Sequence, residues 1–181
     1  MLTITIPGGE YWDESKQEFL HFAKDQNLTL EHSLVSVSKW ESKWNVPWVG
    51  KKKDHAQTVD YIRCMTLTQN VDPEVYRRIT PTHIKMVNNY IALPMTATTF
   101  TIRDKSRYSR EIITAELVYY WMILYGIPFD PCQKWHFNRL LTLVRVCSVK
   151  SQADKKMPAG DVLREQASLN ALRRKKWRTT G

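Results

Sequence analysis

Cysteine, histidine and carboxylate side chains are the groups in this chain that can bind a metal or carry out catalysis. Cys132 and His136 are four residues apart, so on a helix they would share one face. A zinc site needs three or four such ligands, and the sequence has no second close pair. It also lacks a P-loop, a dinucleotide-binding fingerprint and the G-x-S-x-G and H-E-x-x-H motifs. We therefore expect no catalytic residue, no metal, no cofactor and no enzymatic activity.

Three tryptophans, Trp40, Trp44 and Trp48, follow one another at four-residue spacing. On a helix that ends before Pro47, Trp40 and Trp44 lie on one face, and Trp48 either folds back or projects. Such a large apolar surface must be buried in the chain's own core or in a partner. Helical stripes more often face their own domain, and Trp48 is the member expected to be exposed. All three are candidate partner-binding residues.

Positive charge is concentrated at the C-terminal end. The net charge is +9, of which residues 151–181 carry +5 and residues 1–150 carry +4. The candidate electrostatic residues are Arg173, Arg174, Lys175, Lys176 and Arg178. These cations can attract a polyanion or an acidic protein surface, and Trp177 among them can stack on a nucleic-acid base. A solvated helix end, where cations favour the helix dipole, is the simpler alternative.

Short alternating segments at the N-terminus are typical of β-strands. Leu2–Ile6 alternates and is followed by the turn signal Pro7-Gly8-Gly9. Residues 18–22 and 28–30 are predicted to pair with it in a small antiparallel sheet. Strands so few and short need helices to pack against.

The remainder predicts helices, so the expected fold class is mostly α (α+β). Their expected starts are Ser33, Asp54 or Thr58, Asp72-Pro73 (a short turn), Thr80-Pro81, Ser109, Asp130-Pro131 and about Asp161. Residues 98–102 can add a strand. The helix from Ser109 to Gly126 is apolar nearly all round in its second half, which predicts a position in the core or a subunit contact. We expect it to form an antiparallel hairpin with the helix that follows.

Domain organisation and location follow from composition. Residues 1–150 are expected to form one mostly helical globular domain, and residues 151–181 a linker and a basic helical tail. The longest apolar run, Leu117–Tyr125, is nine residues, about half of a membrane span. The three cysteines show no C-x-x-C spacing, which favours a reducing interior, and the N-terminus does not resemble a secretory signal. A cytoplasmic protein without membrane contact is predicted.

Several stretches of the chain resemble a known family. They are LEHSLVSVSKWESKW (30–44), DYIRCMTLTQNVDP (60–73), QKWHFNRLL (133–141) and the basic end. Together they resemble short proteins of long-tailed bacteriophages (siphophages), encoded among the tail-morphogenesis genes and often labelled tail assembly chaperones. The resemblance covers most of the chain.

The resemblance implies a non-enzymatic function in host cytoplasm. Such chaperones bind the tape measure protein, a long helical polypeptide, and cover its apolar surface until tail-tube subunits assemble around it. The implied partners are therefore phage tail proteins, and homo-oligomers are compatible with the role. This chain departs from the better-known tail chaperones in being basic rather than acidic. Two alternatives remain open: a structural head–tail or tail component of the virion, and a basic nucleic-acid-binding accessory protein.

Overall fold

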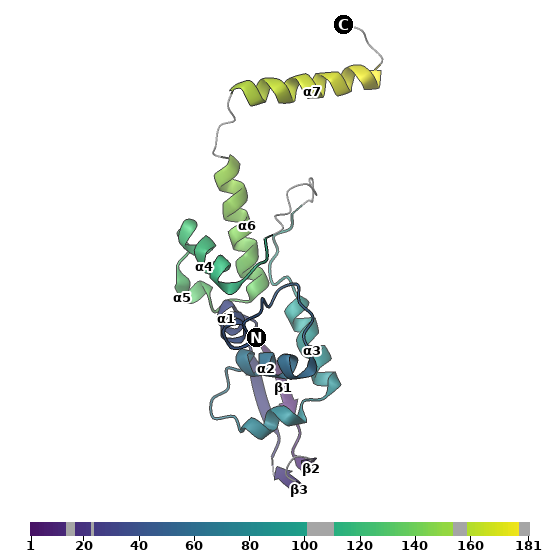
Figure 1. Cartoon of the computed structure of the whole chain (residues 1–181), viewed down its shortest axis with the longest axis vertical. Helices are drawn as coiled ribbons and strands as arrows, with labels where there is room; N and C mark the ends of the chain where they lie inside the picture. The colour runs from purple at the N-terminus through teal and green to yellow at the C-terminus, as the bar shows by residue number, and fades with distance from the viewer. Residues whose placement is uncertain (14–16, 23, 101–110, 154–158, 178–181) are drawn as a thin grey trace. The chain divides into compact units, whose positions relative to one another are not determined.

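The computed structural model describes residues 1–13, 17–22, 24–100, 111–153 and 159–177 (Figure 1). The chain divides into two compact units, Met1–Arg145 and Val146–Gly181. It is 56% helical with small antiparallel β-structure at the N-terminus, which confirms the mostly α prediction.

Four strands form two antiparallel pairs in the first unit. β1 (Leu2–Ile6) pairs with β4 (Gln26–Leu30), and β2 (Gly9–Asp13) pairs with β3 (Glu18–Phe22). The predicted pairing of residues 18–22 with the first strand was wrong, and β2 was missed. β2 begins with glycine and ends with aspartate, two residues that are depleted in strands, so its sequence signal is weak.

The β1–β4 pair places one apolar face in the core. Ile4 and Ile6 from β1 are buried opposite Leu28 and Leu30 from β4, whereas Thr3 and Thr5 are exposed. This alternation is the period of two that the sequence predicted for Leu2–Ile6. The pair therefore has one face on the helical core and the other toward solvent.

The helices and the single 3₁₀ helix of the described chain have the following bounds. They are α1 (Leu34–Trp44), α2 (His55–Met65), η1 (Pro73–Arg78, 3₁₀), α3 (Pro81–Ala92), α4 (Ala115–Leu124), α5 (Phe129–Cys132), α6 (Phe137–Ala153) and α7 (Ala159–Trp177). Ser33, Asp54 and Thr80 each form a capping box at the start of α1, α2 and α3, which confirms these three predicted starts.

The start of α4 differs from the prediction. Ser109 lies outside the described residues, and the helix begins at Ala115 after the cap Thr114, whose Oγ1 accepts a hydrogen bond from Leu117 N at 3.4 Å. Consecutive β-branched residues just before this point disfavour an earlier helical turn. The strand predicted at 98–102 is not formed by its described part, 98–100, and its remainder lies outside the described residues.

The apolar second half of α4 is only partly buried. Val118 and Met122 are in the core, whereas Tyr120, Ile123 and Leu124 are exposed. The helix packs against α1, and the element that follows it is the short α5 rather than the long helix of the predicted hairpin.

The prediction of one continuous helix beginning at Asp130-Pro131 was also wrong. The structure has the short α5 there, and the long α6 begins at Phe137. Asp130 has extended backbone (φ −96°, ψ 127°), as expected for a residue that precedes proline. Phe137, Leu140 and Val144 lie at helical spacing on α6 and are buried, and Leu141 is half-buried.

Candidate interaction cleft

Trp40 is a core residue. Its side chain is 0% exposed, and its Nε1 donates a hydrogen bond to Gln57 O in α2 at 3.0 Å. The Trp40 ring lies 6.3 Å from the Tyr61 ring, nearly perpendicular to it. Trp40 therefore packs α1 on α2 and is not available to a partner, which corrects its place among the partner-binding candidates.

Trp48 folds back onto the core and is half-buried. Its ring lies 4.9 Å from both the His32 and the Tyr61 rings. Lys53 Nζ lies 4.2 Å from the Trp48 ring centroid and donates to Trp48 O at 2.7 Å. Glu41 Oε1 accepts from Trp48 N at 2.7 Å. The prediction that Trp48 is exposed was wrong, because the loop after Pro47 is held down by Glu41 and Lys53.

Two histidines share this buried aromatic cluster. His32 is 0% exposed, and its Nδ1 lies 2.5 Å from Tyr61 Oη. Burial, with further contributions from nearby His136 and Lys53, lowers the pKa of His32 to about 3. Burial raises the pKa of Tyr61. His32 is thus a neutral imidazole that is closed off from solvent.

His136 sits beside His32, with ring centroids 5.0 Å apart. Its Nε2 donates to Tyr90 O at 3.2 Å, and Tyr90 Oη donates in turn to Glu31 Oε1 at 2.7 Å. Burial lowers the pKa of His136. Within the described residues, no group of three or more His, Cys, Asp or Glu side chains is arranged to hold a metal ion. The cluster joins β4, α2, α3 and the start of α6 as part of the core.

Trp44 is the member of the tryptophan stripe that reaches the surface. It is half-buried, and its Nε1 donates to Asp60 Oδ2 at 2.8 Å. Lys43 forms an ion pair with the other oxygen of Asp60. Asp60 is also one of the residues that line a cleft, whereas Trp44 and Lys43 do not line it.

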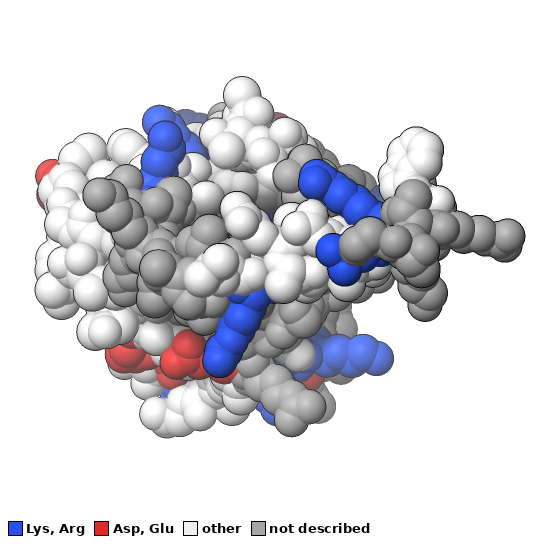
Figure 2. Space-filling model, turned by 90° about the horizontal axis from the view of Figure 1, so that it is seen from above, with Lys and Arg blue, Asp and Glu red and all other residues white. Residues whose placement is uncertain are grey.

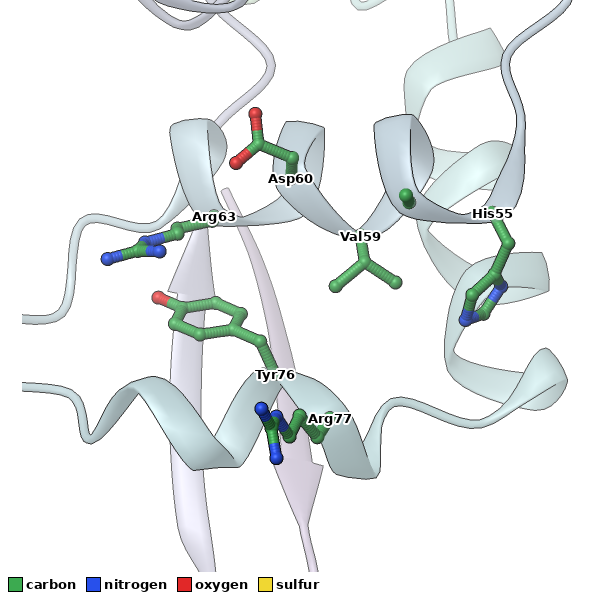
Figure 3. A pocket seen from close by; sticks show the side chains of 7 residues that line it. His55, Val59, Asp60, Arg63, Tyr76 and Arg77 are labelled. Atoms are coloured by element: carbon green, nitrogen blue, oxygen red, sulfur yellow. The ribbon is translucent and has the colours of Figure 1, made fainter. Parts of the chain in front are cut away.

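The cleft lies between α2 and η1 and has a volume of about 430 Å³. Its lining residues are His55, Ala56, Val59, Asp60 and Arg63 from α2, and Tyr76 and Arg77 from η1. Figure 3 shows His55 and Val59 projecting from α2 toward η1 and Tyr76 projecting from η1 toward α2, while the Arg77 side chain lies along η1. The Asp60 carboxylate is directed away from η1.

The α2 wall of the cleft is one face of the helix. His55, Val59 and Arg63 are successive fourth residues and therefore share one face of the helix. Tyr61 on the opposite face and Ile62 on the adjoining face are buried, and they hold α2 on the core. Val59, three residues before the buried Ile62, is half-buried at the floor of the cleft.

The η1 wall is fixed by burial of its other side chains. Val75 is buried, and Arg78, also buried, donates from Nη1 to Pro7 O at 2.5 Å. Tyr76, only 8% exposed, points toward α2, and the exposed Arg77 also lines the cleft. The Arg63 guanidinium lies 5.8 Å from the Tyr76 ring centroid, and Arg77 Nε lies 3.2 Å from Glu74 Oε2.

Sequence reasoning missed Arg63, Tyr76 and Arg77. The four-residue spacing of Val59 and Arg63 was a visible signal for a shared face of α2. Nothing local to residues 73–78 indicates that η1 packs beside that face.

The predicted basic residues of the tail belong to the second unit. Arg173 and Arg174 are exposed on α7, and Trp177 is 72% exposed. Lys175 and Lys176 fall within α7, their side chains outside the described set, and Arg178 lies outside the described residues. Leu163, Leu169 and Leu172 of α7 are also exposed. On the face drawn in Figure 2, lysine and arginine side chains stand at several separate places, one of them beside Asp and Glu side chains.

Comparison with protein-family models, curated proteins and solved structures finds no match to this chain. Among the described helices, none has the length and apolar character needed to cross a bilayer. The class that the fold defines is a mostly α protein, and its candidate site is a solvent-open cleft with an apolar floor and arginines on both walls.

Proposed function

We propose that this chain is a non-enzymatic bacteriophage tail-morphogenesis protein, a tail assembly chaperone that binds the tape measure protein in host cytoplasm. Support comes from the four resembling stretches, which cover α1, much of α2, the start of α6 and the basic end of α7. The tape measure protein is a long helical client, and a cleft between two helical segments suits a helix-in-groove contact.

The exposure of the cleft carries this proposal. His55, Ala56, Arg63 and Arg77 are exposed, although they line one continuous hollow. A site for a small substrate encloses most of its ligand, whereas an open cleft with an apolar floor accepts side chains from a partner's surface. The exposed leucines of α7 supply further apolar surface for a helical client.

Co-expression with the tape measure protein and the tail-tube subunits, followed by pull-down, tests the proposal. The chaperone role predicts a complex with the tape measure protein and the absence of this chain from purified mature virions. Mass spectrometry of those virions is the second measurement. Stoichiometric presence in the particle would reject the chaperone and favour a structural head–tail or tail component.

A nucleic-acid-binding accessory role is the second candidate, and one observation favours it. Arg173 and Arg174 precede the exposed Trp177 by four and three residues on α7, so all three share one side of the helix. An aromatic ring flanked by guanidinium groups can stack on a base while the cations pair with phosphates. This role predicts duplex or single-strand binding that falls steeply with salt and disappears when residues 173–178 are deleted.

A further inference from the structure

We infer that the cleft between α2 and η1 recognises an acidic amphipathic helix of a protein client. One apolar side chain of that helix lies on Val59 and Tyr76, and a carboxylate one turn further along pairs with Arg63. The inference rests on the proposed function and names the chemistry of its client contact.

The charges of the cleft leave Arg63 as the group that can take a new anion. The Asp60 carboxylate already forms an ion pair with Lys43 and accepts a hydrogen bond from the Trp44 N–H. Arg77 pairs with Glu74. Arg63 is exposed and forms no ion pair with any described residue, and its guanidinium is positioned over the Tyr76 ring. A planar guanidinium positioned by an aromatic ring can bind a carboxylate in bidentate geometry, through two parallel N–H···O hydrogen bonds.

The dimensions fit a helix laid along α2, which is the form of the proposed client. Val59 and Arg63 are four residues apart on α2, which separates them by about 6 Å along the helix axis. Residues four apart on a partner helix have the same separation. The whole wall from His55 to Arg63 spans about 12 Å, or two helical turns. A leucine followed by a glutamate four residues later would therefore meet Val59 and Arg63 together.

The same charges disfavour a nucleic acid at this place. A nucleic-acid strand brings repeated phosphates, whereas Arg63 is the one arginine of the cleft lining that has no carboxylate partner among the described residues. One carboxylate on an otherwise apolar helix face satisfies Arg63 and brings no second charge into the cleft. The floor of Ala56, Val59 and Tyr76 would bury that apolar face.

Peptide binding by the full chain tests the recognition chemistry. The probe is a fluorescein-labelled peptide of about 18 residues, long enough to be helical, with a leucine stripe flanked by glutamates. A matched peptide has glutamine at every glutamate position. Fluorescence anisotropy should show binding of the acidic peptide about fivefold tighter than that of the glutamine peptide, a difference that shrinks with added salt.

Variants at Arg63 locate the contact. Arg63→Gln should weaken binding of the acidic peptide about fivefold, Arg63→Glu should weaken it further, and Arg63→Lys should retain part of it. Arg139→Glu is the matched control, because Arg139 is also an exposed arginine on an aromatic ring, 4.1 Å from the Trp135 centroid, but does not line the cleft. Thermal melts followed by circular dichroism check that each variant is folded. If Arg63→Glu does not fold, Arg63→Gln still tests the contact.

Each outcome supports or overturns the inference. Equal loss in the Arg63 and Arg139 variants, or no preference for the acidic peptide, overturns it. Tighter, Arg63-dependent binding of a single-stranded oligonucleotide overturns it too. Pull-down separates the two proposals: capture of the tape measure protein by wild type and Arg63→Glu alike rejects the cleft contact and leaves the chaperone role. Arg63-dependent peptide binding without capture of the tape measure protein supports the cleft chemistry and rejects that client.

Discussion

Acid should destabilise this fold chiefly through the buried imidazole of His32. The residue is 0% exposed, and its ring is enclosed by Trp48, Tyr61 and His136. Its pKa is about 3 in the folded chain and 6.5 when unfolded, since burial and the nearby cation Lys53 both oppose protonation. Between these two pH values the unfolded chain binds a proton that the folded chain does not. The stabilisation is therefore complete above pH 6.5 and is lost as the pH falls toward 3.

The size of the effect follows from this difference in proton binding. Stability should fall by roughly 1 kcal/mol for each pH unit below 6.5, and by about 2 kcal/mol between pH 7 and pH 5. His136, whose pKa is lowered by burial, adds to the loss in the same direction.

Urea unfolding at a series of pH values measures this loss. The control is His32→Gln, which keeps a polar side chain but cannot gain the proton. Its free energy of unfolding should be lower than wild type at pH 7 and should change about 2 kcal/mol less between pH 7 and pH 5. Parallel pH dependence in the two proteins would refute the reasoning. So would an NMR titration in which the His32 imidazole protonates near pH 6.

Substitutions at two residues, Trp48 and Glu41, test the contacts that hold the loop after α1. Trp48→Ala should lower stability by about 3 kcal/mol, because the ring packs on His32 and Tyr61; a melting temperature close to wild type would place the ring outside the core. Glu41→Gln should cost about 1–3 kcal/mol in urea unfolding, because the two carboxylate oxygens accept from Trp48 N and Ala115 N, and an amide can serve only one of them. Glu41→Ala should cost at least as much, and an unchanged midpoint in either variant would contradict this bridging role.

Helix starts were the most predictable features of the fold. Ser33, Asp54 and Thr80 each accept a hydrogen bond from a backbone N–H three residues later. Such caps depend on neighbours in the chain, and a sequence displays them directly. The start of α4 was missed although its cap, Thr114, also accepts from a backbone N–H three residues later. Its first amide, Ala115 N, donates in addition to Glu41, a residue distant in the chain.

The tryptophan stripe illustrates the opposite case. Its four-residue spacing predicted a shared helical face, and α1 does carry Trp40 and Trp44. Which ring is buried depends on α2, since Gln57 accepts from Trp40 and Asp60 from Trp44. The position of Trp48 depends on His32, which is distant in the sequence. No pattern within residues 34–48 contains these partners.

Composition, helix caps and apolar periodicity were sufficient to establish a mostly α fold with a short N-terminal β-segment, and the basic end of α7. These properties arise from interactions between residues that are close together in the sequence. The cleft arises differently. Its walls, α2 and η1, come together because Ile62, Val75 and Arg78 are buried on other elements, and this packing leaves Arg63 and Tyr76 face to face. Contacts between distant segments depend on how the whole core fills, so they became visible only in the folded chain.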